Sequence, residues 1–180
     1  SDLGITELHK AFGEKYGINP DYAAEAHYIL GERAFEVFSR SDLKTSQKGK
    51  AGKKDIENRL KEKRESLKGP LDPFAKCIAL QTDKWTPRAT FMCGEIFWNL
   101  METVKEQTIL EKDPSQIAYT KVKINEVLPQ YFDKAMEYYF INVDKFSNKM
   151  GVKNEWIDRS AEKFAQAWYM IGFSHVENGE

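Results

Sequence analysis

The stretch that decides the fold class is FDKAMEYYFINVDKFSNKMG, residues 132–151. Apolar residues recur in it every three or four positions, the spacing of one face of an α-helix. Gly151 is expected to end this helix, and Asn154, a good helix cap, to begin another. The two apolar stripes are Phe132, Ala135, Met136, Tyr139, Val143, Phe146 and Met150, then Ile157, Ala161, Phe164, Ala165, Trp168, Ile171, Gly172 and His175. They predict two long amphipathic helices.

Prolines extend this helical pattern toward the amino terminus. Proline suits the first turn of a helix, where its missing N–H has no bond to lose. Four pairs join a capping residue to a proline and predict helix starts: Asn19-Pro20, Asp72-Pro73, Thr86-Pro87 and Asp113-Pro114. Lys68-Gly69-Pro70 predicts a helix end, and Pro129 either ends a helix or begins the next one. The stretch 119–127 alternates briefly like a strand, but without a partner strand it is expected to be helical.

The apolar spacing, the caps and the prolines together predict an all-α fold. We expect a single-domain helical bundle spanning residues 1–180, with about six or seven helices and one basic flexible loop. The helix that begins at Pro20 is apolar on two sides, so we expect it to be contacted on both. One side carries Ala23, Ala26, Leu30, Ala34 and Val37, and the other carries Tyr28, Phe35 and Phe38.

Composition favours a globular protein in a reducing, cytoplasmic compartment. A chain of 180 residues with 41% hydrophobic residues can bury a core without crosslinks. Its two cysteines, Cys77 and Cys93, form no C-x-x-C pair, which argues against a disulfide framework and a cysteine-rich zinc site. No apolar run approaches the length of a membrane span, and the first residues lack the pattern of a signal peptide. We therefore expect a cytoplasmic location without membrane association.

Charge is distributed unevenly along the chain. Residues 44–68 contain ten Lys or Arg against four Asp or Glu, whereas the formal net charge of the whole chain is −1. The first part, residues 44–54, is rich in lysine and glycine without any large apolar residue, which is typical of a flexible loop or linker. From about Asp55 the segment is expected to continue as a thinly amphipathic helix.

A flexible basic loop leading into a basic helix places several cations where each can displace a counterion from phosphate. The candidate nucleic-acid-binding residues are Lys44, Lys48, Lys50, Lys53, Lys54, Arg59, Lys61, Lys63, Arg64 and Lys68. No aromatic residue lies between Phe38 and Phe74 to stack on bases, so contacts would be to the backbone of nucleic acid or another polyanion. The alternative is a solvated helix with internal ion pairs, such as Asp55 with Arg59.

Residues able to carry out chemistry are sparse. His175 lies on the apolar face of the last predicted helix, where it could be a ligand or base but more simply bonds the carbonyls of the helix end. Glu25, Glu32 and Glu36 share one helical stripe without an evident metal or acid-base partner. Cys93 is expected to be an inert core residue. The sequence favours a non-catalytic protein, and we predict no catalytic residue, metal or cofactor.

Aromatic residues leave two kinds of partner open. Residues 131–180 hold 11 of the 23 aromatics, which could line a small-molecule pocket or simply form core. Phe91 and Trp98 border the acidic face of the helix that begins at Pro87. Large rings in that position are typical of anchors for a protein partner or a second copy, and equally of packing against the Pro20 helix.

The leading hypothesis is an interaction module that contacts a polyanion through residues 44–68. The alternatives are a small-molecule binder and an enzyme that uses His175 or the glutamate stripe.

Overall fold

The computed structural model describes the backbone of residues 19–47, 49–110 and 114–177 and, within these ranges, the side chains outside 107–110, 114–127 and 168–177. The described residues are mainly helical and contain no strand, so the all-α prediction is confirmed for them. The elements are α2 (Pro20–Arg40), α3 (Gly49–Glu65), α4 (Lys68–Ala79), α5 (Thr86–Leu110), α6 (Pro114–Ile141), a π-helix η1 (Asn142–Lys149) and α7 (Glu155–Glu177).

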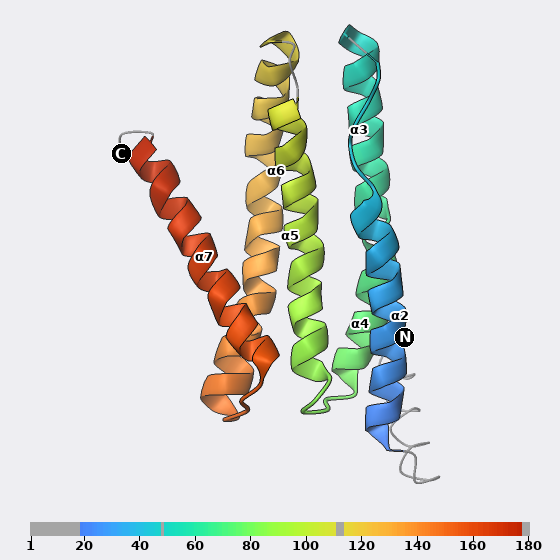
Figure 1. Ribbon diagram of the computed structural model, residues 1–180, viewed down its shortest axis with the longest axis vertical. Coiled ribbons are helices and arrows are strands. Elements are labelled where there is room, and N and C mark those ends of the chain that lie inside the picture. Colours follow the sequence, from blue (N-terminus) through green and yellow to red (C-terminus); the bar gives the residue numbers. More distant parts are fainter. Residues whose placement is uncertain (1–18, 48, 111–113, 178–180) are drawn as a thin grey trace.

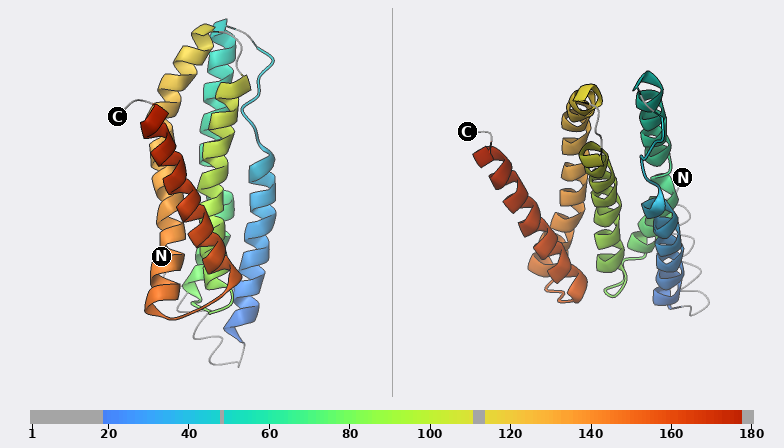
Figure 2. Two further views of the ribbon diagram at one scale, coloured as in Figure 1. Left: turned by 60° about the vertical axis from the view of Figure 1, so that its left-hand side comes forward. Right: turned by 45° about the horizontal axis from the view of Figure 1, so that its top comes forward.

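The helices form an elongated bundle with two tightly packed pairs (Figures 1 and 2). Helix α2 packs on α4, α5 packs on α6, and the contact of α4 with α5 joins the pairs. Helix α7 packs against α5, α6 and η1 near its amino-terminal end and leans away from them toward its carboxyl end (Figure 1). Helices α3 and α4 follow one another along the length of the molecule, so α3 extends beyond the α2–α4 pair (Figure 1).

Several helix ends lie where local chemistry predicts them. The Oδ1 atom of Asn19 accepts a hydrogen bond from the backbone N–H of Asp21 at 2.9 Å, with Pro20 in the first position of α2. Asn154 caps α7 in the same way, accepting from two backbone N–H groups. Gly151 adopts φ +68°, a conformation that suits glycine after a helix end. Pro87 and Pro114 lie in the first turns of α5 and α6.

Three predictions from prolines are wrong. Lys68-Gly69-Pro70 begins α4 instead of ending a helix, and Pro73 lies inside the same helix. Pro70 fits because the first helical turn needs no N–H there, while Pro73 removes one backbone bond, to the carbonyl of Gly69. Pro129 lies inside α6 and neither ends nor begins a helix. The stretch 119–127 is part of α6, as expected.

The predicted loop over residues 44–54 is wrong for residues 49–54, which form the first turns of α3. Lysine and alanine are good helix formers, so the propensity of this stretch is helical despite its glycines. The remaining linker is extended and locally braced. Thr45 Oγ1 accepts from the backbone N–H of Gln47 at 3.1 Å, and Leu43 is buried against Val104. The linker is therefore held partly by its own backbone and partly by α5, and in the left view of Figure 2 it bows away from α3 before it reaches the start of that helix.

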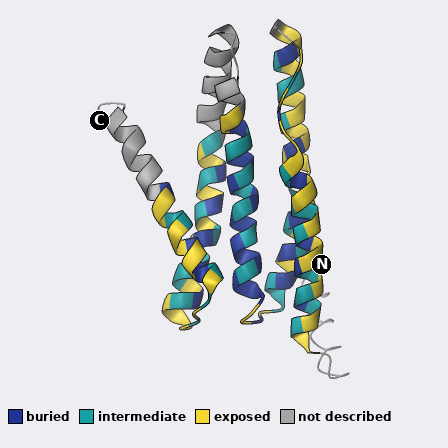
Figure 3. Cartoon of the chain, in the orientation of Figure 1, coloured by how far each residue is buried: buried dark blue, intermediate teal, exposed yellow. Residues whose placement is uncertain are grey.

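The core lies mainly between α2, α4, α5 and α6 (Figure 3). Helix α2 buries the side that carries Tyr28, Gly31 and Phe38, and leaves the side with Leu30 and Val37 exposed. Gly31 allows this side of α2 to lie close to Phe74 of α4, because any residue with a Cβ atom at position 31 would place that atom 2.6 Å from the ring of Phe74. The sequence predicted that α2 is contacted on both sides. Among the described residues, only the side with Tyr28 and Phe38 is packed, and the side with Leu30 and Val37 faces solvent.

Candidate functional site

The candidate site is one face of α3, which we call the basic face. With about 100° of rotation per residue, Lys50, Lys53, Lys54, Lys61 and Arg64 lie within one third of the helix circumference. Glu57 and Glu65 are the carboxylates on the same face. From Lys50 to Arg64 the face is about 21 Å long. Its five cations against two carboxylates leave a local positive charge on the part of α3 that extends beyond the α2–α4 pair (Figure 1).

The ion pairs of the basic segment are mostly weak and exposed. Lys61 Nζ lies 3.9 Å from Glu65 Oε1, and the two side chains are 75% and 67% exposed. Lys44 Nζ lies 3.6 Å from Asp42 Oδ2, also in solvent. Exposed pairs of this kind contribute about 0–1 kcal/mol, so an anionic partner can displace them at little cost.

Arg59 is more firmly held, on the opposite side of α3 from the basic face. Its Nε donates to Asp55 Oδ2 at 3.1 Å, as expected for a pair four residues apart. A hydrogen bond from Thr45 and the guanidinium of Arg59 hold the pKa of Asp55 below its usual range. This contact ties the linker to the first half of α3.

Three candidate cations, Lys50, Lys54 and Lys68, are exposed and form no ion pair with the part of the chain that the structure describes. Lys48 lies outside the described residues. Lys53 is half-buried at the edge of the basic face. Lys50 and Lys54 are therefore the candidates best placed to meet a polyanion.

Lys63 is not available for such contacts, which corrects the sequence prediction. It is 3% exposed, and its Nζ donates to the carbonyl of Ser41 at 2.6 Å and to Thr103 Oγ1 at 2.9 Å. The ammonium also lies 4.8 Å from the centroid of the Phe38 ring. Burial lowers the pKa of Lys63 to about 8, an effect that the carboxylates of Asp42 and Glu106 partly oppose. Lys63 thus joins α3 to α2 and α5.

Arg64 borders the bundle. Its guanidinium lies 5.7 Å from the ring centroid of Tyr131 on α6, a cation–π contact across two helices. A shallow depression of about 340 Å³ runs along this side of α3, lined by Glu57, Leu60, Lys61, Arg64 and Glu65. Because two carboxylates share this depression, it is less suited to phosphate than the turns around Lys50 and Lys54.

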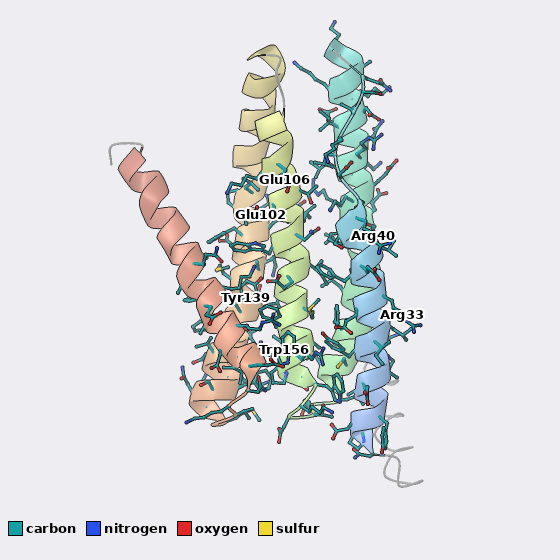
Figure 4. The ribbon with its side chains drawn as sticks, in the orientation of Figure 1. Arg33, Arg40, Glu102, Glu106, Tyr139 and Trp156 are labelled. Atoms are coloured by element: carbon teal, nitrogen blue, oxygen red, sulfur yellow. The ribbon has the colours of Figure 1, made fainter. Side chains whose placement is uncertain are left out.

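A second site lies at the far end of the bundle, where the start of α5 meets the start of α7. The guanidinium of Arg88 lies 4.3 Å from the ring centroid of Tyr28 and 4.8 Å from that of Trp156. Figure 4 labels Trp156 near the start of α7, at the end of the bundle where α5 begins. It also forms an ion pair with Glu32 at 3.5 Å. The adjoining pocket of about 460 Å³ is lined by Asp83, Lys84, Trp85, Arg88, Val152, Lys153, Asn154, Glu155 and Trp156.

Two buried donors in this second site, Nε1 of Trp85 and Nε of Arg88, have no hydrogen-bond partner among the described residues. The sequence interpretation missed Arg88. A weak signal was available, since Trp85 and Arg88 flank a predicted helix start and Trp156 follows a predicted cap.

The glutamate stripe of α2 is used for internal contacts. Tyr28 donates to Glu32 Oε1 at 2.8 Å, and Glu36 pairs with Arg40. Glu25 has no ion pair with any described residue. Among the described side chains, no three His, Cys, Asp or Glu residues converge as a metal site would require.

The proposed aromatic anchors are core residues. Phe91 is 6% exposed and Trp98 is 8% exposed, and both rings contact Tyr139 of α6. Of the two alternatives, exposed anchors or internal packing, the structure has internal packing, with α6 in contact with the two rings in place of the expected Pro20 helix. Because both rings are buried, they are not placed on the surface where a partner could reach them. Cys93 is buried, which raises the pKa of its thiol. The side chain of His175 lies outside the described part of the structure.

Comparison with known proteins gives no guide to function. No family model matches the chain, and no curated protein or solved structure is significantly similar to it. Within the described ranges, no helix combines the length and apolarity that a bilayer crossing requires.

Proposed function

We propose that this chain is a non-catalytic helical interaction module that holds a polyanion, most simply the phosphate backbone of nucleic acid, on the basic face of α3. The observation that carries the proposal is the row of five cations from Lys50 to Arg64, four of them exposed, on a helix that extends beyond the α2–α4 pair. We place this activity in the cytoplasm, where the two free, buried thiols are compatible with a reducing environment.

Binding by this face is expected to be weakly selective. Side chains on the basic face offer ammonium and guanidinium groups without an aromatic ring for base stacking. Phosphate contacts fix a nucleic acid in place but carry no sequence information. Affinity should therefore depend steeply on salt, because each neutralised phosphate releases a condensed counterion.

The test is binding of labelled single-stranded RNA of about 20 nucleotides, followed by fluorescence anisotropy between about 50 and 200 mM salt. The variant replaces Lys50, Lys54 and Lys61 with glutamine. If all three contact phosphate, the slope of log affinity against log salt should fall in magnitude by about 2, since each contact contributes about 0.7 on a single strand.

The matched control replaces Lys76, Lys134 and Lys145 with glutamine. These lysines are exposed, lie on α4, α6 and η1 outside both candidate sites, and carry the same total charge, so the net charge changes by the same amount. The control should keep the slope of the unmodified protein. The proposal fails if both variants lose affinity equally, or if the unmodified protein binds no RNA at the lowest salt.

A second candidate function is binding of a small anionic molecule in the pocket beside Arg88. The pocket combines Lys84, Arg88 and Lys153 with the rings of Trp85 and Trp156, and it lies at the starts of two helices, which favour negative charge. Inorganic phosphate or benzoate should then raise the thermal midpoint of the unmodified protein but not that of Arg88→Met. Equal shifts in both proteins would refute this candidate.

A further inference from the structure

The charge of the basic face is uneven along the length of α3. Lys50 and Lys54 form one pair of cations toward the start of the helix. Lys61 and Arg64 form a second pair toward its end, and Glu57 lies between the two pairs on the same face. At about 1.5 Å of rise per residue, the centres of the pairs are about 16 Å apart along the helix axis. The face therefore has two positive ends and a negative centre.

The charged groups of this pattern are accessible to a partner. The side chains of both pairs and of Glu57 are exposed. Lys53, at the edge of the face, adds to the charge of the first pair. Glu65 lies past the second pair, with its Oε1 atom 3.9 Å from Lys61 Nζ. Because α3 extends beyond the α2–α4 pair (Figure 1), an anionic partner can meet both pairs of cations at once.

A single nucleic-acid strand matches this pattern poorly. Each strand carries one phosphate per nucleotide, about 3.4 Å apart along the axis of a duplex, so consecutive phosphates are much closer together than the two pairs of cations. A strand that contacts both pairs therefore also places phosphates beside Glu57, where like charges repel each other. The face has no aromatic ring that could compensate by stacking on the bases.

We propose that the basic face binds double-stranded nucleic acid, with α3 bridging the two phosphate rows that border a wide groove. This inference rests on the proposed function and specifies the form of the polyanion. The major groove of B-form DNA is about 12 Å wide, and the phosphate centres on its rims lie several ångströms farther apart, close to the separation of the two pairs. In A-form RNA the wide groove is the minor groove. In either duplex each pair of cations meets one row of phosphates, and Glu57 lies over the groove, away from both rows.

Binding to duplexes and to single strands with the same number of phosphates tests the proposal. The probes are labelled duplexes of about 20 base pairs, one of DNA and one of RNA, and unstructured single strands of about 40 nucleotides, followed by fluorescence anisotropy at about 50 mM salt. At least one duplex should bind at least about twofold more tightly than the single strand of the same sugar, and the tighter duplex identifies the groove. Equal or tighter binding of both single strands would overturn the duplex inference and leave the proposed function standing, whereas no binding of any probe would refute both.

Removal of the central carboxylate distinguishes the two forms of nucleic acid. In Glu57→Gln, affinity for the single strands should rise about two- to threefold, the Coulomb effect of one carboxylate about 6 Å from one phosphate in water. Affinity for the preferred duplex should change less, because its phosphates lie farther from Glu57. The matched control, Glu62→Gln, removes an exposed carboxylate from another side of α3 with the same change of net charge, and it should affect binding less than Glu57→Gln. An equal gain for duplex and single strand in Glu57→Gln, or no gain for either, would refute the bridging arrangement.

Exchange of two charges tests the spacing at constant net charge. Lys54→Glu combined with Glu57→Lys keeps the numbers of cations and carboxylates on the face but moves one cation from the first pair to the centre. The slope of log affinity against log salt for the preferred duplex should fall in magnitude by about 0.9, because one phosphate contact is lost. The slope for the single strands should not fall, since a continuous row of phosphates meets the displaced cation equally well. An unchanged slope on the duplex, or an equal fall on both forms, would overturn the proposal.

Discussion

The variant Lys63→Met tests whether the buried ammonium of Lys63 raises or lowers the free energy of unfolding. Lys63 connects α3 to α2 and α5 through two hydrogen bonds, to the carbonyl of Ser41 and to Thr103 Oγ1. Methionine keeps the unbranched stem but removes the charge and the donors. At neutral pH two effects oppose each other. The loss of two hydrogen bonds from a charged donor destabilises the variant by about 3–6 kcal/mol, and relief from burying a charge stabilises it by about 3 kcal/mol. At pH 7 the free energy of unfolding of the variant should therefore be lower than that of the unmodified protein by about 0–3 kcal/mol.

The pH dependence separates these effects. Burial lowers the pKa of Lys63 from 10.5 in the unfolded chain to about 8 in the folded protein. Between these values the unfolded chain holds more protons, so the free energy of unfolding rises with pH. From pH 7 to pH 10 the unmodified protein should gain about 2.5 kcal/mol relative to Lys63→Met.

Urea unfolding followed by circular dichroism, at pH values from 7 to 10, measures this difference. Tyrosine ionisation affects both proteins alike and cancels in the comparison. Lys61→Met is the matched control, because Lys61 is exposed and two residues away, and its difference from the unmodified protein should not change with pH. A flat difference for Lys63→Met would mean that folding does not lower the pKa of Lys63, and a falling one would mean that the site stabilises the ammonium; either result would refute the reasoning.

Three further predictions concern packing, capping and thiol reactivity. Gly31→Ala should destabilise the protein by about 1–3 kcal/mol in urea unfolding, because its Cβ would meet Phe74, whereas Gly69→Ala, with no atom within 4 Å, should be neutral or stabilising. Asn154→Ala should lower stability by about 1 kcal/mol by removing the cap of α7, and an unchanged melting temperature would contradict this. Burial raises the pKa of the Cys77 thiol to about 12, so neither cysteine should react with Ellman's reagent at pH 8 until urea is added.

Local features of the sequence were sufficient for the fold class and for several helix ends. Asn19, Asn154 and Gly151 act on backbone groups within a few residues, so their effect does not depend on distant parts of the chain. The prolines were less reliable, because Pro73 and Pro129 lie inside helices that tolerate the loss of one backbone bond. Local composition also misled the loop prediction, since glycine and lysine are compatible with the start of α3.

Sequence alone determined that the chain is helical and that its cations concentrate in residues 44–68, because periodicity and composition are properties of neighbouring residues. Tertiary structure decided which apolar side of α2 is buried, since both sides fit a core and only the close approach of α4 at Gly31 selects one. It also decided that Lys63 and Trp98 are internal, while Lys50 remains in solvent. Burial depends on which elements meet in space, and that information is not contained in the spacing of residues along one helix.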